Sequence, residues 1–181
     1  MKKMFLVLLA AGFAASCTNN KSATSTSSPG QDSALAALNW KDSMIQQNKA
    51  LILSDFQALN SGDMAGAIKG TAPDAVDYGD GSSNPIHGAD SIIAGLKEFQ
   101  DAFPDNKASN FLVVGDLHHV AIFSDWTGTF TKPFMGMNPT HKSYKYRDVD
   151  LFTFNDSGQI TEHHNIMPFR DILLQVGGKM K

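Results

Sequence analysis

The stretch that decides the fold is SYKYRDVDLFTFNDSGQITEHHNIM, residues 143–167. Its first half, Ser143–Phe154, alternates in side-chain character with a period of two, as expected of a strand whose neighbouring residues point to opposite faces. Asn155–Gly158 has the composition of a tight hairpin turn, and Gln159–Met167 forms a second alternating run. The stretch therefore predicts two antiparallel strands joined by a short turn.

Upstream of this hairpin the pattern predicts strands first and, further upstream, helices. Between Pro104 and the hairpin the period of two predicts strands at 108–114 and 118–131. Before Pro104, apolar residues recur at helical spacing, which predicts helices over 40–60, 63–69 and 89–103, with a short strand at 75–78. A final helical turn is predicted at 171–176. Helices followed by an antiparallel meander indicate an α+β fold in one domain, 37–181.

The N-terminus has the pattern of an export signal. Lys2 and Lys3 precede an apolar run, Met4–Ala15, which is too short to span a bilayer and ends in small residues before Cys17. This arrangement resembles the lipobox of bacterial lipoproteins. The resemblance implies that residues 1–16 are removed and that Cys17 carries a lipid, which anchors the protein to a membrane of the cell envelope. An ordinary secretory signal with an unrelated cysteine is the alternative.

Composition limits the partners. Residues 17–36 are rich in Ser, Thr and Asn, which predicts a flexible tether after the lipidated cysteine. Without Lys2 and Lys3, 13 basic residues face 18 acidic ones, a net charge of −5, which argues against a nucleic-acid partner. Cys17 is the single cysteine, so the exported domain has no disulfide.

The two strands of the hairpin carry the candidate site. One face of the first strand combines apolar walls with a few polar groups, which is typical of a cavity for a small, mostly apolar ligand. A carboxyl group among aromatic rings tends to have a raised pKa, which suits proton transfer. We predict that His163 pairs with Asp150 or Asp148 as an acid–base couple; solvated rim carboxylates and a structural histidine are the alternatives. The candidate catalytic residues are Asp150, His163 and Asn165, and the candidate ligand-binding residues are Tyr78, Tyr146, Asp148, Phe152 and Met167.

A metal site is not predicted, although the chain has six histidines. The pairs His118-His119 and His163-His164 lie on predicted strands, so the two members of each pair point to opposite faces. Neither pair can therefore chelate one ion. A site with one histidine from each pair plus a carboxylate stays open as an alternative.

Several segments, taken together, resemble the SnoaL-like polyketide and ester cyclase group of the nuclear transport factor 2-like superfamily. The resemblance covers about residues 47–177. It rests on the order and spacing of short segments, which are LNSGD at 59–63, HG at 87–88, FPD at 103–105, TGT at 127–129, FMGMNPT at 134–140, the run from Asp148 to His163, and QVG at 175–177.

The resemblance implies a cone-shaped fold in which N-terminal helices pack in a curved antiparallel sheet. It also implies cofactor-independent acid/base chemistry of the cyclase, isomerase or hydrolase kind, and a possible homodimer through the convex face of the sheet. Family members use an aspartate near the end of the last strand with a histidine on the strand before. Aligned at the turn, Asn165 takes the aspartate position and Asp150 takes the histidine position.

Two interpretations follow from this exchange: Asp150 is the base and Asn165 orients it, or both residues bind a ligand without chemistry. At the level of the whole protein, the alternative to an enzyme is a non-catalytic binding or interaction module at the cell envelope.

Overall fold

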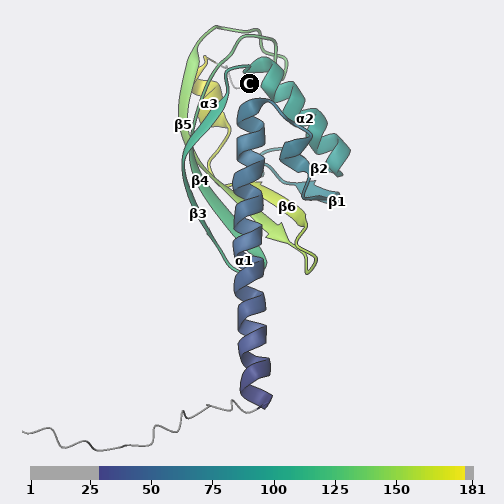
Figure 1. Ribbon diagram of the computed structural model, residues 1–181. Helices are drawn as coiled ribbons and strands as arrows, with labels where there is room; N and C mark the ends of the chain where they lie inside the picture. Colours follow the sequence, from purple (N-terminus) through teal and green to yellow (C-terminus); the bar gives the residue numbers. More distant parts are fainter. Residues whose placement is uncertain (1–28, 178–181) are drawn as a thin grey trace, which may run out of the picture.

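The structure is a computed structural model that describes residues 29–177. Cys17, the expected signal peptide and most of the expected tether lie outside the described residues. The described part contains three α-helices, a 3₁₀-helix and six strands (Figure 1). Their order is α1 (Pro29–Ser61), η1 (Gly66–Ile68), β1 (Thr71–Asp77), β2 (Ile86–His87), α2 (Ala89–Ala102), β3 (Lys107–Gly115), β4 (His119–Thr129), β5 (Ser143–Phe154), β6 (Ile160–Asn165) and α3 (Arg170–Gln175).

The described strands form one curved sheet in the order β2-β1-β6-β5-β4-β3. Strands β3 to β6 are the predicted antiparallel meander, and Gly158 in the β5–β6 turn has φ +74°, a left-handed conformation that glycine adopts without steric cost. β1 pairs with β6 in the parallel sense, so the sheet is mixed and not wholly antiparallel as expected. Local periodicity does not report pairing between strands about 90 residues apart, which is why this pair was not predicted.

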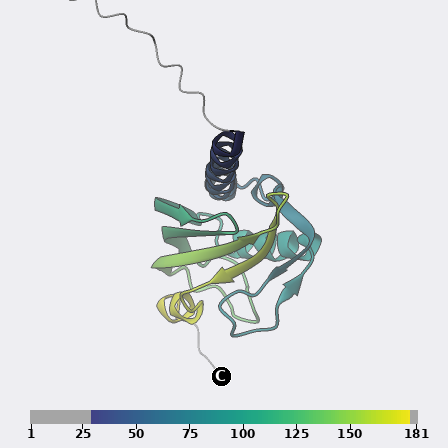
Figure 2. The same ribbon diagram turned by 90° about the horizontal axis from the view of Figure 1, so that it is seen from below.

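The two longer helices cover different parts of one face of the sheet. α1 packs against β3 and β4, whereas α2 packs against β1 and β2. Seen from below, α1 lies nearly end-on at one side of the curved sheet (Figure 2). The predicted α+β architecture, with N-terminal helices against a curved sheet, is therefore confirmed, and the strands between the helices, β5 and β6, line the centre of the concave face.

α1 is longer than the sequence pattern predicted. It begins at Pro29 and not near Trp40, so residues 29–36 of the expected tether are helical. Proline is favoured in the first helical turn, and the run 34–38 (ALAAL) consists of strong helix formers. This N-terminal part projects beyond the sheet (Figure 1), and residues 30–36 are exposed. At the other end, Gly62 with φ +79° ends the helix.

Two apolar clusters fill the interior. The first joins α1 to the sheet and consists of Ile52, Phe56, Ala108, Val120, Ile122, Phe154 and Ile160. The second joins α2 and α3 to the sheet and consists of Ala102, Phe103, Phe130, Tyr144, Tyr146, Ile172 and Val176. Trp126 packs against both clusters. The buried polar residues of β4 and β5 described below lie in the stretch of sheet between them.

Among the helices of residues 29–177, none combines the length and the apolar character needed to cross a bilayer.

Candidate functional site

A buried polar layer crosses the concave face of the sheet. Strand register places Ser124 of β4 opposite Asp148 of β5, and Asp150 of β5 opposite Asn165 of β6. Because alternate residues of a strand share a face, Tyr146, Asp148, Asp150 and Phe152 point the same way. Asp148 and Asp150 are each only 4% exposed, so both predicted carboxylates are interior groups and not solvated rim charges.

His163 joins two carboxylates from different strands. Its Nε2 lies 3.1 Å from Oδ1 of Asp150, and its Nδ1 lies 2.9 Å from Oδ1 of Asp77. Asp77 reaches this position because the parallel pairing places it opposite His163 in register. The predicted His163–Asp150 pair therefore forms, and it is extended by a third residue.

The two carboxylates determine the charge of His163. Burial by itself would lower the pKa of the imidazole, but the hydrogen bonds to Asp150 and Asp77, together with their negative charges, raise it to about 10. In return, the hydrogen bond and charge of His163 overcome the effect of burial and lower the pKa of Asp77. His163 is therefore an imidazolium at neutral pH, whose two ring N–H groups each donate a hydrogen bond to a neighbouring carboxylate, and it is not itself a base.

Asn165 holds both carboxylates of β5. Its Nδ2 donates to Oδ2 of Asp148 at 3.0 Å and to Oδ1 of Asp150 at 2.7 Å. Asp148 also accepts the backbone N–H groups of Val149 and Met167. Burial, and then the charge of Asp150, raise the pKa of Asp148 to about 6 despite these hydrogen bonds.

Three buried oxygen atoms in this layer have no hydrogen-bond partner within residues 29–177. They are Oδ2 of Asp150, the hydroxyl of Tyr146 and Oγ of Ser124. Burial, followed by the charges of Asp148 and Asp150, raises the pKa of Tyr146, so this hydroxyl keeps its proton. A buried polar atom without a partner costs about 1–3 kcal/mol. Three such atoms lie on neighbouring residues of one face, so this part of the layer has unused capacity for hydrogen bonds.

Aromatic rings surround the polar layer. Phe152 stacks on His163 with ring centroids 4.7 Å apart, and its other neighbour is Phe56 of α1, at 6.4 Å. Phe56 also packs against Trp126, at 5.5 Å. These rings exclude water from the carboxylates and leave an apolar wall facing any ligand.

Two predicted ligand-binding residues lie elsewhere. Tyr78 stacks on His164, with ring planes 4° apart, on the face of the sheet opposite to His163. The side chain of Met167 is 39% exposed, and its contribution to the layer is the backbone N–H that Asp148 accepts. The other predicted site residues, Tyr146, Asp148, Asp150, Phe152, His163 and Asn165, are brought together.

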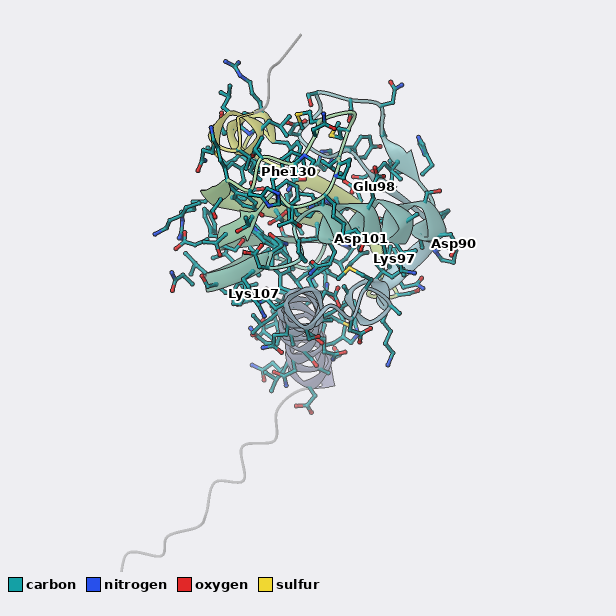
Figure 3. All side chains as sticks on the ribbon, turned by 90° about the horizontal axis from the view of Figure 1, so that it is seen from above. Asp90, Lys97, Glu98, Asp101, Lys107 and Phe130 are labelled. Carbon is teal, nitrogen blue, oxygen red and sulfur yellow. The ribbon has the colours of Figure 1, made fainter. Side chains whose placement is uncertain are left out.

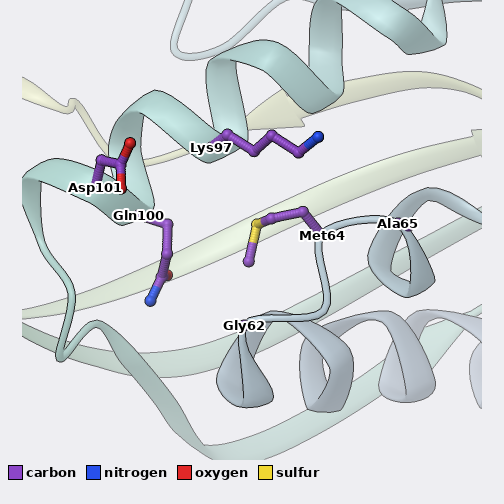
Figure 4. A pocket seen from close by; sticks show the side chains of 6 residues that line it. All are labelled: Gly62, Met64, Ala65, Lys97, Gln100 and Asp101. Atoms are coloured by element: carbon purple, nitrogen blue, oxygen red, sulfur yellow. The ribbon is translucent and has the colours of Figure 1, made fainter.

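A groove of about 410 Å³ lies between the end of α1 and α2, and none of the predicted site residues lines it. Gly62, Met64 and Ala65 form one side, and Lys97, Gln100 and Asp101 form the other. Figure 3 looks down onto this end of the domain and labels Lys97 and Asp101 on α2. In the close view, Met64 reaches into the space between the helices, and Gln100 points toward the end of α1 (Figure 4).

Comparison with known proteins gives the family. The model of the SnoaL-like polyketide cyclases matches residues 50–176, which is most of the chain. The chain belongs to the SnoaL-like polyketide cyclase family. No curated protein matches it.

Solved structures agree with this SnoaL-like assignment. AclR from Streptomyces galilaeus, a candidate hydroxylase, is 28% identical with a TM-score of 0.63, over 74% of this chain and 97% of AclR. IdmH from Streptomyces antibioticus, a candidate polyketide cyclase, is 27% identical with a TM-score of 0.60, over 72% and 99%. A candidate SnoaL-like polyketide cyclase from Jannaschia sp. CCS1 shares the fold, with a TM-score of 0.68 at 21% identity over 76% and 96%.

The candidate site contains two residues, Asp77 and Ser124, that the sequence patterns do not mark as site residues. Asp77 stood in a predicted strand but gained its role only through parallel pairing with β6. Ser124 occurs in the predicted second strand, and its alternation with Ile122 and Trp126 is the one signal that could have placed it on the inner face.

Within the described residues, no group of three histidine, cysteine, aspartate or glutamate side chains is arranged to hold a metal ion.

Proposed function

We propose that this SnoaL-like domain binds a small, largely apolar carbonyl compound on the concave face of its sheet and moves a proton on it. Asp150 is the base in this proposal. The step needs no cofactor: Oδ2 of Asp150 takes a proton from the carbon next to the carbonyl, the C–H electron pair moves to form an enolate, and the proton returns to the same or another atom of the substrate.

The observation that carries the proposal is the asymmetry of the Asp150 carboxylate. Oδ1 accepts hydrogen bonds from His163 and Asn165, which fix the orientation of the group. Oδ2 is buried and has no partner within residues 29–177. A general base must present a free lone pair to its substrate, and Oδ2 of Asp150 is the one carboxylate oxygen among residues 29–177 that is fully buried and has no hydrogen-bond partner.

The substrate carbonyl has two suitable donors nearby. The hydroxyl groups of Tyr146 and Ser124 are buried, keep their protons at neutral pH and lie beside Asp148 and Asp150. Donors that are already in place stabilise the oxygen on which negative charge develops, and they do so strongly where water is excluded. Tyr146 and Ser124 therefore support an enolate intermediate.

A carboxylate is a weak base compared with the enolate that it would form, so a fairly acidic C–H group is the suitable proton donor. The His163 N–H donates to Oδ1 of Asp150 and leaves Oδ2 for the substrate. A carbon between two carbonyl groups, or next to a carbonyl and an aromatic ring, has this acidity. Asp77 acts through His163 and is a positioning residue.

The alternative function is ligand binding without chemistry. Asn165, which cannot exchange a proton, stands where the resemblance implies the family's acid/base aspartate, and aromatic rings pack closely around the site. Both features favour a binding module, which keeps the same residues in contact with the ligand but leaves its C–H bonds intact.

We also propose an envelope location and a dimer. The Cys17 pattern supports lipidation, which is tested by labelling cells with a palmitate analogue and comparing wild type with Cys17→Ser.

The convex face of the sheet supports the proposed dimer. Leu112 and Val114 of β3 are 54% and 46% exposed, and they lie beside Phe123 and Ala121 of β4. A second copy that covers this face would bury the apolar row.

Exchange of carbon-bound protons tests the catalytic proposal. The probe is 2-tetralone, a flat aromatic ketone whose protons at C1 exchange in D₂O and are followed by NMR. We expect wild type to accelerate the exchange, Asp150→Asn to abolish the acceleration, and Asp156→Asn in the exposed β5–β6 turn to keep it. Binding of the probe without accelerated exchange would favour the binding module, and equal acceleration by Asp150→Asn would refute Asp150 as the base.

A further inference from the structure

A second buried carboxyl group lies on α1, away from the Asp150 layer. Asp55 is 5% exposed, and its helical neighbours Ile52 and Phe56 belong to the core cluster that joins α1 to the sheet. Within residues 29–177 the Asp55 side chain makes no hydrogen bond and no ion pair. Burial alone raises its pKa to about 7, with no neighbouring charge contributing.

Helix geometry places Asp55 on the face of α1 that also carries Gly62, a residue lining the groove between α1 and α2. Asp55, Leu59 and Gly62 are spaced four and three residues apart, so they follow one face of α1. Exposure rises along this line, from buried Asp55 through half-buried Leu59 to exposed Gly62, which lines the groove. Met64, 6% exposed, lies between Gly62 and α2 (Figure 4).

Aromatic side chains connect Asp55 to the Asp150 layer. The next residue, Phe56, packs against Phe152, which stacks on His163. The domain therefore has one polar group on the sheet and another on α1, and the Phe56–Phe152 contact joins the two elements. A ligand that reaches both groups needs an oxygen at each end and an apolar part between them.

We propose that Asp55 is a second ligand-binding group, which hydrogen-bonds an oxygen of the ligand at the end opposite the Asp150 layer. The inference rests on the proposed function, because it assumes that a small molecule enters this interior. It adds the ligand's chemistry: a largely apolar ring system with a hydroxyl or carbonyl at each end. The Asp55 carboxyl is largely removed from water and makes no hydrogen bond within residues 29–177, and a ligand hydroxyl would supply one.

The test compares two probes that differ by one oxygen, 2-tetralone and 6-hydroxy-2-tetralone. We expect wild type to bind the hydroxylated probe about tenfold more tightly, measured as a Kd ratio by titration calorimetry; a factor of ten corresponds to about 1.4 kcal/mol. Asp55→Leu should bring this ratio to about one. The control is Asp42→Leu, an exposed aspartate on the same helix, which should keep the wild-type ratio.

Unfolding in urea gives a readout that does not depend on the probes. If Asp55 serves a ligand, Asp55→Leu removes an unpaired buried carboxyl and the urea midpoint of the free protein rises at pH 8. A midpoint that falls would assign Asp55 a structural role and overturn the inference. A Kd ratio that survives Asp55→Leu overturns it as well, and it leaves the Asp150 proposal standing if Asp150→Asn still abolishes exchange.

The two proposals fail in distinguishable ways. Probe binding that depends on Asp55, without accelerated proton exchange, overturns catalysis by Asp150 and supports Asp55. A wild-type protein that binds neither probe overturns both.

Discussion

Replacing Asp77 with asparagine tests the charged chain Asp77–His163–Asp150. Asparagine keeps a carbonyl oxygen for the Gly79 N–H, which Asp77 Oδ1 accepts at 2.8 Å, so the change isolates the loss of charge next to His163. A hydrogen bond to a charged group contributes about 1.5–3 kcal/mol and a neutral one about 0.5–1.5 kcal/mol. Because the Asp77 side chain is only 19% exposed, we expect the free energy of unfolding to fall by about 1–2 kcal/mol.

The pH dependence of this loss is specific. His163 has a folded-state pKa of about 10, above its unfolded value of 6.5, so its contribution to stability is fully present below pH 6.5 and is lost as the pH rises through 10. The difference between wild type and Asp77→Asn should therefore be largest at pH 6 and close toward pH 10. The lowered pKa of Asp77 makes stability vary only at acidic pH, because its contribution is fully present above the unfolded value of 3.8 and is lost as the pH falls through the lower folded value.

The assay is urea unfolding followed by circular dichroism at pH 6, 7, 8, 9 and 10, with the His163 ring titrated by NMR in parallel. Asp125→Asn is the control, because Asp125 pairs with Arg147 at 2.6 Å and the guanidinium stays charged over this range. Its effect on stability should not change with pH. A wild-type His163 that titrates near 6.5, or an Asp77→Asn difference that is constant from pH 6 to 10, would refute the reasoning.

Three further changes have direct outcomes. Asn165→Asp places a third carboxylate beside Asp148 and Asp150. The free energy of unfolding, measured with urea, should therefore fall by about 2–3 kcal/mol at pH 8 and recover partly at pH 5. Unchanged stability at pH 8 would contradict the packing of these three groups. Phe56→Ala removes a ring that packs on Phe111, Trp126 and Phe152 and should cost about 3–5 kcal/mol in the same assay, and a loss under 1 kcal/mol would show that the ring is not core. Leu112→Lys should convert a dimer to a monomer in sedimentation velocity, while Leu35→Lys, at an exposed leucine of α1, should not; a wild-type protein that is already monomeric would exclude the dimer.

Much of the site could be predicted from the sequence because it lies on one hairpin. Asp148, Asp150, His163 and Asn165 are close along the chain, and alternation along two strands joined by a short turn is enough to place them on one face. The family model then agrees with the resemblance read from the same segments. The start of α1 differs from the predicted one because the Ser-, Thr- and Asn-rich composition of residues 17–36 predicts a tether, whereas the helix-forming run at 34–38 continues the helix toward the N-terminus.

Contacts between residues far apart in the chain could not be predicted from such patterns. Periodicity reports which residues share a face of one element, and it carries no information about which elements meet. Asp77 and His163 are 86 residues apart, and only the parallel pairing of β1 with β6 joins them. Asp55 reads in the sequence as one polar residue within a helical stripe, and only the packing of α1 on the sheet shows that it is buried.

The sequence by itself thus determined the α+β class, the β5–β6 hairpin and the identity of the inner carboxylates, because these depend on local alternation and turn chemistry. The tertiary structure alone decided the charge of His163, the free Oδ2 atom of Asp150 and the separate carboxyl on α1. These properties depend on burial and on the distances between strands and helices, and both exist only in the folded chain.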